Sequence, residues 1–331
     1  MRVLITAVGG PAGMASLFSL RDVKEKIFIV GVDMDPLAPG LYLSNKHYLV
    51  PGAYEDRYLT TILSIARAEH IDVILPGSDE EVEVLSREKD TIVKNQIAIP
   101  VPDHEVVMRA RDKSLTYHFL KDLSPLPKTV CFTPGDPEVD ISSLGFPMFA
   151  KPCKGRGGFG SKYIENDAQL KFFLKEITQP YVIQEYIKGD VFLVQAILDR
   201  KQEVLASIVH RRLKTKHPQS GTAIAAETVR DEEMRAVAEH ALEKLEWYGP
   251  SGVELIGDKR DGVPKIIEVN PRICGQSYLS AKAGMNLAYM TAKLALGEKV
   301  PVIRNYEDEL VFTRSWSDRV MRKVELVKKS F

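Results

Sequence analysis

Two glutamates in the last third of the chain have the spacing of a divalent-cation site. The runs Gly252–Gly257 and Pro264–Val269 flank a turn centred on Asp261, which predicts a β-hairpin. Folding the chain back about Asp261 places Glu254 directly opposite Glu268. Directly opposed residues have Cβ atoms roughly 5 Å apart. Two carboxylates at this separation repel each other unless a cation lies between them.

Asn270 extends this pair into a set of three oxygen-bearing side chains. It lies two residues after Glu268, so both side chains project from the same face of the strand. Mg²⁺ prefers oxygen ligands at about 2.1 Å and commonly binds carboxylates together with nucleotide phosphates. A solvated hairpin face is the alternative, but the neighbouring Val253, Leu255 and Ile267 are apolar and indicate burial. We therefore predict a magnesium site at Glu254, Glu268 and Asn270.

A glycine-rich loop follows a predicted strand at residues 146–151. It runs from Lys151 to Ser161, with glycines at 155, 157, 158 and 160. Closely spaced glycines leave backbone N–H groups free to bind a phosphate, and Lys151 and Lys154 add positive charge. The order of its last residues differs from a Walker A loop, which ends Gly-Lys-Ser/Thr. A flexible surface loop is the alternative, but it would hardly need the two lysines.

The elements that position these residues fall into two regions, of which the first is an α/β unit. Short apolar runs at 2–8, 27–32 and 73–76 predict strands, and helical patterns occur at 15–24 and 58–69. This alternation predicts a parallel sheet covered by helices on both faces.

The first strand leads into the turn Gly9–Gly13, which raises the alternative of an NAD-dependent oxidoreductase. The turn does not match G-x-G-x-x-G, so dinucleotide binding rests on weak support. We predict a tight turn in a supporting domain, at a helix N-terminus that could face an anionic substrate.

The sequence pattern of the second region predicts an α+β fold. A helix at 103–123 leads into a proline-rich stretch at 124–137. Further along, the patterns predict helices that start at Asn166 and Asp231, strands at 181–187, 191–198 and 203–209, and a final strand, turn and basic tail within 310–331. We divide the chain into domains 1–102, 103–187 and 188–331.

Composition excludes several classes of function. Lys+Arg and Asp+Glu both number 45, so no net charge attracts the chain to nucleic acid or to a membrane. No apolar run is long enough for a transmembrane helix. Three separated cysteines and seven scattered histidines show no zinc-binding spacing, which indicates reduced thiols in a cytoplasmic protein.

Taken in order, the motifs resemble those of the ATP-grasp superfamily. The matching signals are Lys113, Lys151 with its glycine loop, the run Gln184–Ile187 followed by Gly189, Glu254, and Glu268-x-Asn270-x-Arg272. The stretch 267–297 is most similar to one ATP-grasp unit of the carbamoyl phosphate synthase large chain. The resemblance implies a Rossmann-like pre-ATP-grasp domain followed by a two-lobed ATP-grasp domain.

The resemblance also implies roles for individual residues. ATP phosphates would contact Lys113, Lys151, Lys154, Gly155, Gly157, Gly158, Gly160 and Ser161. Gln184, Glu185, Tyr186 and Ile187 would surround adenine, and Arg272 with Lys151 would stabilise the transferring phosphate. The family often has a ribose-binding glutamate two residues after the glycine, where this chain has Val191, so Asp190 is the substitute. Lys113, Glu185 and Arg272 also have purely structural alternatives.

The reaction implied is ATP- and Mg²⁺-dependent formation of an acyl phosphate from a carboxylate, which an amine then attacks, with Mn²⁺ able to replace Mg²⁺. The basic run His210, Arg211, Arg212 and Lys214, together with Gln276, could bind the anionic substrate, and residues 217–222 would form a mobile loop. Residues 9–14, 78–81 and 276–282 would define small-molecule substrates, and a homodimer is possible. Phosphorylation of bicarbonate or carbamate, and a non-catalytic nucleotide-binding regulatory module, are the alternatives.

Overall fold

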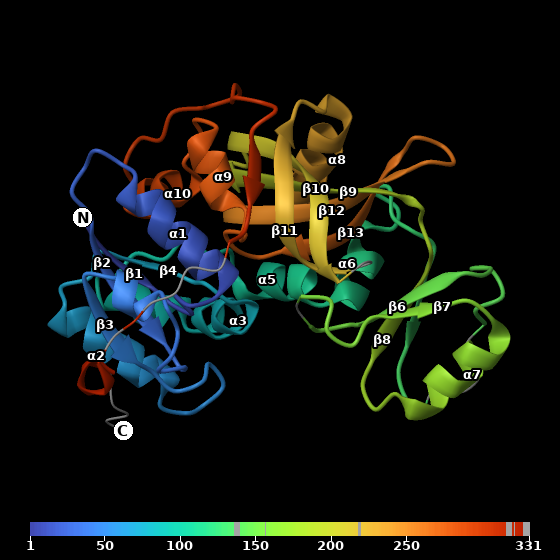
Figure 1. The fold of residues 1–331 in the computed structure, drawn as a ribbon, viewed down its shortest axis with the longest axis horizontal. Coiled ribbons are helices and arrows are strands. Elements are labelled where there is room, and N and C mark those ends of the chain that lie inside the picture. Colours follow the sequence, from blue (N-terminus) through green and yellow to red (C-terminus); the bar gives the residue numbers. More distant parts are fainter. Residues whose placement is uncertain (136–139, 156, 218–219, 316–319, 321, 327–331) are drawn as a thin grey trace.

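The N-terminal unit contains the predicted parallel sheet, to which β3 (Lys46–Leu49) adds a fourth strand that the sequence pattern did not predict. The computed structural model describes residues 1–135, 140–155, 157–217, 220–315, 320 and 322–326. Strands β1 (Arg2–Ile5), β2 (Phe28–Asp33), β3 (Lys46–Leu49) and β4 (Val73–Leu75) lie in the order β3-β2-β1-β4. Helices α1 (Pro11–Arg21), α2 (Tyr58–Ala68), α3 (Asp79–Arg87) and α4 (Lys89–Lys94), with a 3₁₀ turn at Leu41–Leu43, accompany them (Figure 1).

Helix α1 begins four residues before the predicted start at residue 15, because Pro11 occupies its first turn. Proline suits that position, since its missing N–H has no partner to lose there. The turn before it is tight: a Cβ on Gly13 would lie 2.4 Å from the carbonyl oxygen of Ala7. Close packing of helix against strand therefore explains this glycine.

The small lobe is a four-stranded antiparallel sheet in the order β5-β8-β6-β7. Its strands are β5 (Thr129–Phe132), β6 (Met148–Pro152), β7 (Lys162–Ile164) and β8 (Tyr181–Glu185), and α7 (Asp167–Glu176) packs on them. Asn166 caps α7 as predicted, accepting a hydrogen bond from Gln169 N at 3.0 Å. Strand β5 lies within the proline-rich stretch, where the sequence pattern did not predict a strand.

The large lobe is a six-stranded sheet in the order β13-β12-β9-β10-β11-β14. The strands are β9 (Gly189–Leu198), β10 (Val204–His217), β11 (Ser220–Val229), β12 (Gly249–Asp258), β13 (Pro264–Asn270) and β14 (Val311–Thr313), and α8 (Glu232–Lys244) packs on the sheet. The predicted mobile loop at 217–222 includes residues 218–219, which lie outside the described residues, and its flanks belong to β10 and β11.

The single helix predicted at 103–123 is two helices, α5 (His104–Arg111) and α6 (Lys113–Leu120). Asp112 interrupts them with an extended backbone (φ −99°, ψ 113°) and caps α6, accepting a hydrogen bond from Ser114 N at 2.9 Å. Both helices pack in the core of the large lobe through residues such as Ala110 and Leu120. The domain boundaries stay a prediction.

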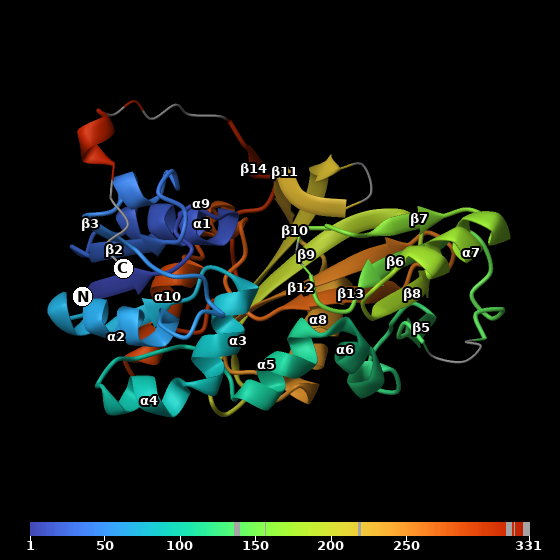
Figure 2. The ribbon, with the colours of Figure 1, turned by 90° about the horizontal axis from the view of Figure 1, so that it is seen from below.

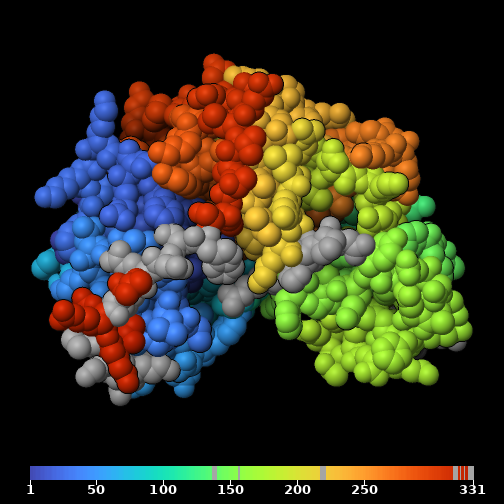
Figure 3. Space-filling model, in the orientation of Figure 1, coloured from blue at the N-terminus to red at the C-terminus, as the bar shows by residue number. Residues whose placement is uncertain are grey.

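The N-terminal unit and the large lobe share a hydrophobic core. Helices α9 (Ser277–Lys282) and α10 (Leu287–Ala295) pack against α1 (Figure 2). Ile273, Ala288 and Ala292 thereby join the core around β1. In the space-filling view the N-terminal unit and the small lobe lie at opposite ends of the molecule, and the large lobe connects them (Figure 3). A 3₁₀ turn at Lys323–Glu325 follows β14, and none of the described helices is long and apolar enough to span a membrane.

Candidate active site

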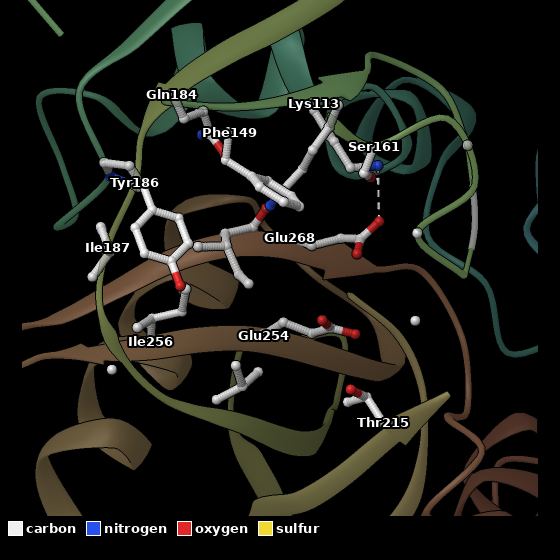
Figure 4. Close-up of a pocket in the computed structure, with 18 of the residues that line it drawn as sticks. Lys113, Phe149, Ser161, Gln184, Tyr186, Ile187, Thr215, Glu254, Ile256 and Glu268 are labelled. Carbon is white, nitrogen blue, oxygen red and sulfur yellow. Dashed lines mark hydrogen bonds and ion pairs between the residues drawn. The ribbon is translucent and has the colours of Figure 1, made fainter. Parts of the chain in front are cut away.

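A cleft of about 1100 Å³, including its open mouth, separates the small lobe from the sheet of the large lobe. The small lobe contributes β6, β8 and the glycine loop, and the large lobe contributes β9, β10, β12, β13 and the first residue of α6. Tyr186, Ile187 and Ile256 gather at one end, and Glu254, Glu268 and Lys113 lie towards the other (Figure 4). The cleft is therefore apolar at one end and charged at the other.

The hairpin register places Glu254 opposite Glu268, as predicted. The pairing is regular from Gly252–Asn270 to Glu254–Glu268, and a β-bulge then shifts it by one residue so that Leu255 pairs with Ile266. The pairing predicted from a turn centred on Asp261 is therefore correct only at the end of the hairpin that carries the two carboxylates. The bulge leaves Ile267 unpaired, and this residue lines the cleft.

Cations flank both carboxylates. Lys113 Nζ lies 2.8 Å from Glu268 Oε1, an ion pair shown by the dashed line in Figure 4. Arg212 of β10 forms a short ion pair with Glu254. Burial raises the pKa of Glu268, but the attraction of Lys113 and Lys151 outweighs it, and the net pKa is lowered. Both carboxyl groups therefore sit in a positive field.

The donor set fits Mg²⁺ that is also bound by a nucleotide. No group of three or more His, Cys, Asp or Glu side chains is arranged around a metal position in the part of the chain that the structure describes. Two opposed carboxylates are enough when phosphate oxygens complete the coordination shell. Asn270 turns its amide nitrogen towards Glu254 Oε1 at 3.4 Å and its oxygen towards Arg272. A ligand role for Asn270 requires the opposite amide orientation.

Two partly buried lysines lie beside the carboxylates. For Lys113, burial lowers the pKa, but the interaction with Glu268 outweighs it and leaves the pKa raised. For Lys151, burial dominates and lowers the pKa to about 8. Lys151 Nζ lies 3.5 Å from the carbonyl oxygen of Ile267 and makes no ion pair within the described residues. It is therefore available to an incoming phosphate.

The glycine loop contributes only part of its predicted residues to the cleft. Gly155, Gly158 and Ser161 line it, whereas Gly157 and Gly160 do not. Positive φ angles of 60°, 75° and 78° at Gly157, Gly158 and Gly160 explain why glycine occupies these positions. Lys154 does not line the cleft, and its Nζ lies 3.9 Å from Glu83 Oε1 of α3.

The run Gln184–Ile187 lines the apolar end, the position expected for adenine. Both carboxylate oxygens of Glu185 are already engaged: Oε1 accepts from Lys128 N at 2.9 Å, and Oε2 lies 2.8 Å from Arg260 Nη2. A contact between this carboxylate and adenine would compete with these partners. Phe149, Ile256 and Ile267 also line the cleft.

Asp190 does not line the cleft, so the geometry does not support its predicted ribose contact. Its side chain is 53% exposed and lies 3.6 Å from Lys259 Nζ. Its neighbours Gly189 and Val191 line the cleft instead. The alternation of side chains along β9 is the physical reason, since adjacent residues point to opposite faces.

Arg272 does not line the cleft either. Its Nε lies 2.6 Å from Asp79 Oδ1, at the start of α3 in the N-terminal unit. It also approaches Asn270 Oδ1 at 3.5 Å, so it connects α3 to the carboxylate strand. Burial lowers the pKa of Arg272, but the neighbouring Asp79 carboxylate outweighs this and raises it. The predicted structural ion pair is present, and contact with phosphate stays a prediction.

Of the basic run, only Arg212 lines the cleft. His210 is fully buried between Gln195 and Ser280, and burial lowers its pKa to about 3, so its predicted substrate contact is wrong. Arg211 pairs with Glu227, and Lys214 is exposed away from the cleft. These two predicted contacts are also not supported by the geometry.

Gln276 is 4% exposed and its Nε2 has no hydrogen-bond partner within the described residues. Gln276 immediately precedes α9, and its buried side chain does not line the cleft. The geometry therefore does not support the predicted substrate contact of Gln276.

The comparison with family models decides the class of this cleft. Residues 110–276, half of the chain, match the model described as "ATP-grasp domain". The chain belongs to the ATP-grasp family. Residues 3–100 match a second model, "PylC-like, N-terminal domain". The predicted family and fold class are thereby confirmed, and membership fits an ATP-dependent, ADP-forming ligase.

Known relatives of this ATP-grasp protein include much longer chains. It is 22% identical over 308 residues to the arginine-specific carbamoyl phosphate synthase large chain of Eremothecium gossypii, covering 89% of this chain and 28% of that one. It is also 22% identical to the N-terminal section of the carbamoyl phosphate synthase large chain of Methanopyrus kandleri, covering 89% of this chain and 55% of that section. The chain thus spans less than two thirds of these relatives.

Solved structures share the fold of this ATP-grasp protein. Biotin carboxylase from Campylobacter jejuni matches with a TM-score of 0.71 and 19% identity, covering 91% of this chain and 72% of that one. N5-carboxyaminoimidazole ribonucleotide synthetase from Thermotoga maritima matches with a TM-score of 0.68 and 19% identity, covering 94% and 79%.

Two cleft-associated residues escaped the sequence analysis for identifiable reasons. Asp79 belongs to the run 78–81, which was assigned to substrate choice, and its pairing with Arg272 joins residues far apart in the chain. Val191 was noted only as a departure from the family pattern, although strand alternation alone places it beside Gly189 on the cleft face.

Proposed function

We propose that this protein activates a carboxylate with ATP and Mg²⁺ as an acyl phosphate, which an amine then attacks to release phosphate. The observation that supports this most directly is the charged end of the cleft. There, the partly buried Lys113 and Lys151 face the opposed Glu254 and Glu268 below the glycine loop.

Each group has a task that its surroundings favour. Glu254 and Glu268 would hold Mg²⁺, which neutralises phosphate charge when bound. Lys151, without an ion pair in the described region, would bind the nucleotide phosphates, including the transferring one, and Lys113 would bridge Glu268 and the phosphates. Glycine-loop N–H groups at Gly155 and Gly158 would close over the phosphates. Catalysis would then depend on positioning and charge stabilisation.

The proposed reaction has two substitution steps and involves no oxidation or reduction. A carboxylate oxygen of the substrate attacks the γ-phosphorus of ATP, the bond to the bridging oxygen breaks, and ADP leaves. The amine nitrogen then attacks the acyl carbon, phosphate leaves, and the nitrogen loses a proton as the amide forms. Arg212, at the edge of the charged end, would stabilise the phosphorylated intermediate once Glu254 turns to the cation.

A second candidate is phosphorylation of bicarbonate or carbamate. It is favoured by the similarity of most of this chain to a part of carbamoyl phosphate synthase large chains. The two candidates share the nucleotide chemistry and differ only in the acceptor.

Release of ADP from purified protein, Mg²⁺ and ATP would test both candidates. The assay would screen amino acids with amines, and bicarbonate with an ammonia source, each against a mixture without acceptor. Release that requires a carboxylate and an amine supports the ligase. Release that requires only bicarbonate supports the second candidate. Tight ATP binding with no release under any mixture would favour the regulatory module.

The same proposal covers the substrates, the metal ion and the cellular location of the protein. Small-molecule carboxylate and amine substrates fit a cleft enclosed between two lobes. Mn²⁺ would replace Mg²⁺, since both accept oxygen ligands. The free thiols of Cys131, Cys153 and Cys274 favour a reducing, cytoplasmic location. A homodimer would be tested by light scattering.

A further inference from the structure

The sheet face that carries the two carboxylates continues beyond the charged end of the cleft. Glu254 of β12 and Glu268 of β13 line the cleft. Two residues further from the apolar end, on the same strand face, Gly252 pairs with Asn270 on one side and with Gln195 of β9 on the other. These three residues are buried and do not line the cleft, so this part of the sheet is covered.

The cover is the segment that follows β13. A Cβ on Gly252 would lie 2.3 Å from Cys274 Sγ, so a glycine is needed for the segment to lie this close to the sheet. The backbone N–H of Cys274 donates a hydrogen bond to Gln195 Oε1 at 3.3 Å. The segment 271–274 therefore crosses the sheet next to the two carboxylates, and it includes Arg272.

The amide of Gln195 is 1% exposed and joins this segment to two other elements. Besides Cys274 N, its Oε1 accepts a hydrogen bond from Ser277 Oγ at the start of α9. Its Nε2 donates to Ser280 Oγ at 3.1 Å and lies 3.3 Å from His210 Nδ1 of β10. Burial lowers the pKa of His210 to about 3, so its ring is neutral and Nδ1 can accept. The amide oxygen and nitrogen of Gln195 thus both have partners.

We propose that Gln195 is a positioning residue, which holds the segment 271–274 against the sheet. Through this segment it sets the places of Arg272 and Asn270. Arg272 Nη2 lies 3.5 Å from Asn270 Oδ1, and Asn270 Nδ2 lies 3.4 Å from Glu254 Oε1, so the segment is connected to one of the carboxylates. A satisfied buried network fixes one arrangement of the groups that it joins, and stabilisation of a transition state depends on such fixed positions. The inference rests on the proposed function and adds to it a residue outside the cleft.

The test compares two serine-to-alanine variants of the full-length protein. Both hydroxyls are fully buried, but Ser277 contacts Gln195 and lies 2.8 Å from the carbonyl oxygen of Cys274, whereas Ser207 of β10 donates to Glu239 of α8 on the other face of the sheet. We expect Ser277→Ala to lower kcat for Mg²⁺-dependent ADP release by about fivefold, the effect of one hydrogen bond, and to leave the Kd for ADP within about twofold. Ser207→Ala should leave both constants within about twofold, although each variant lowers the midpoint of urea unfolding.

Substitution of the amide itself is the stronger variant. Gln195→Met keeps a side chain of similar length but removes the acceptor, and it should lower kcat by about tenfold or more with little change in the Kd for ADP. Gln195→Glu retains an oxygen that accepts from Cys274 N, and it should keep kcat within about threefold. If Gln195→Met does not fold, the comparison of Ser277→Ala with Ser207→Ala decides.

Three outcomes would overturn the role of Gln195. They are equal losses of kcat in the two serine variants, equal losses in the two Gln195 variants, and a loss of ADP affinity in Ser277→Ala that matches its loss of kcat. The last would indicate general damage to the cleft. Absence of ADP release by the unaltered protein with every acceptor mixture would overturn the proposed function itself. That failure appears before any variant is made, so the two failures are distinguishable.

Discussion

At the scale of single residues, the most consequential feature is that Lys151 is partly buried and has no ion-pair partner in the described region. Its neighbour Lys113 is also partly buried but has Glu268 as an ion-pair partner, and the pKa values of the two lysines shift in opposite directions for this reason. A lysine with a lowered pKa carries its charge only below that pKa. Phosphate binding by Lys151 should therefore depend on pH near 8.

We predict that ADP affinity decreases as the pH rises above about 8, by up to about tenfold per pH unit, because only protonated Lys151 attracts phosphate. Titration of ADP between about pH 7 and 9.5 measures this. Lys151→Met should bind ADP weakly at pH 7 and lose the pH dependence in this range. An unchanged profile in that variant would assign the dependence to another group.

At the scale of elements, the β12–β13 hairpin positions the carboxylates. A β-bulge follows Glu254, yet the pairing on the Asn270 side is regular, so Glu254 and Glu268 face each other. We predict that Glu268→Gln reduces Mg²⁺-dependent ATP turnover by about a hundredfold or more, since it removes an oxygen ligand and a charge. The control Glu176→Gln changes an exposed residue at the end of α7. Normal turnover in Glu268→Gln would refute the metal assignment.

Helix α3 also helps to position the site. Its first residue, Asp79, forms an ion pair with Arg272 in the segment after β13. Removal of one partner leaves a buried charge unpaired. We predict that Asp79→Asn lowers the free energy of unfolding by about 3 kcal/mol.

A double-mutant cycle separates this pair from general damage to α3. Arg272→Met combined with Asp79→Asn should recover most of the lost stability in urea unfolding, because neither charge then remains buried. Asp90→Asn is the control, since this residue is an exposed acid in the first turn of α4. Additive losses in the double variant would contradict a direct interaction.

At the scale of the whole molecule, the N-terminal unit and the large lobe are joined through one core. The packing of α10 residues Ala288 and Ala292 with Val3 and Leu17 is continuous across the predicted boundary at residue 102. Cleft residues from the large lobe are thus held by the N-terminal unit as well as by their own sheet.

This shared core predicts cooperative unfolding. Leu17→Ala should lower the free energy of unfolding by about 2 to 5 kcal/mol and shift the transition of Trp247, a buried residue in the core of the large lobe. Trp247 fluorescence in a Trp316→Phe background measures the transition during urea unfolding. Lys24→Ala, at an exposed position, is the control. An unchanged Trp247 transition in Leu17→Ala would show that the two parts unfold separately.

The sequence by itself determined the features that depend on neighbours along the chain. The turn at Asp261 and strand alternation were enough to oppose Glu254 and Glu268, and local capping placed the starts of α7 and α8. The parallel N-terminal sheet followed from the alternation of apolar runs and helical patterns. These features depend on backbone periodicity and short-range hydrogen bonds, which a linear pattern records.

Only the tertiary structure decided which polar residues face the cleft. His210 and Arg212 are two residues apart and share a strand face, but Ser280 of α9 covers the first while the second reaches Glu254. The partnership of Arg272 with Asp79 likewise connects distant segments. Burial and ion pairing arise from the packing of elements against one another. Strand periodicity can assign a face to a residue, but it does not identify what covers that face.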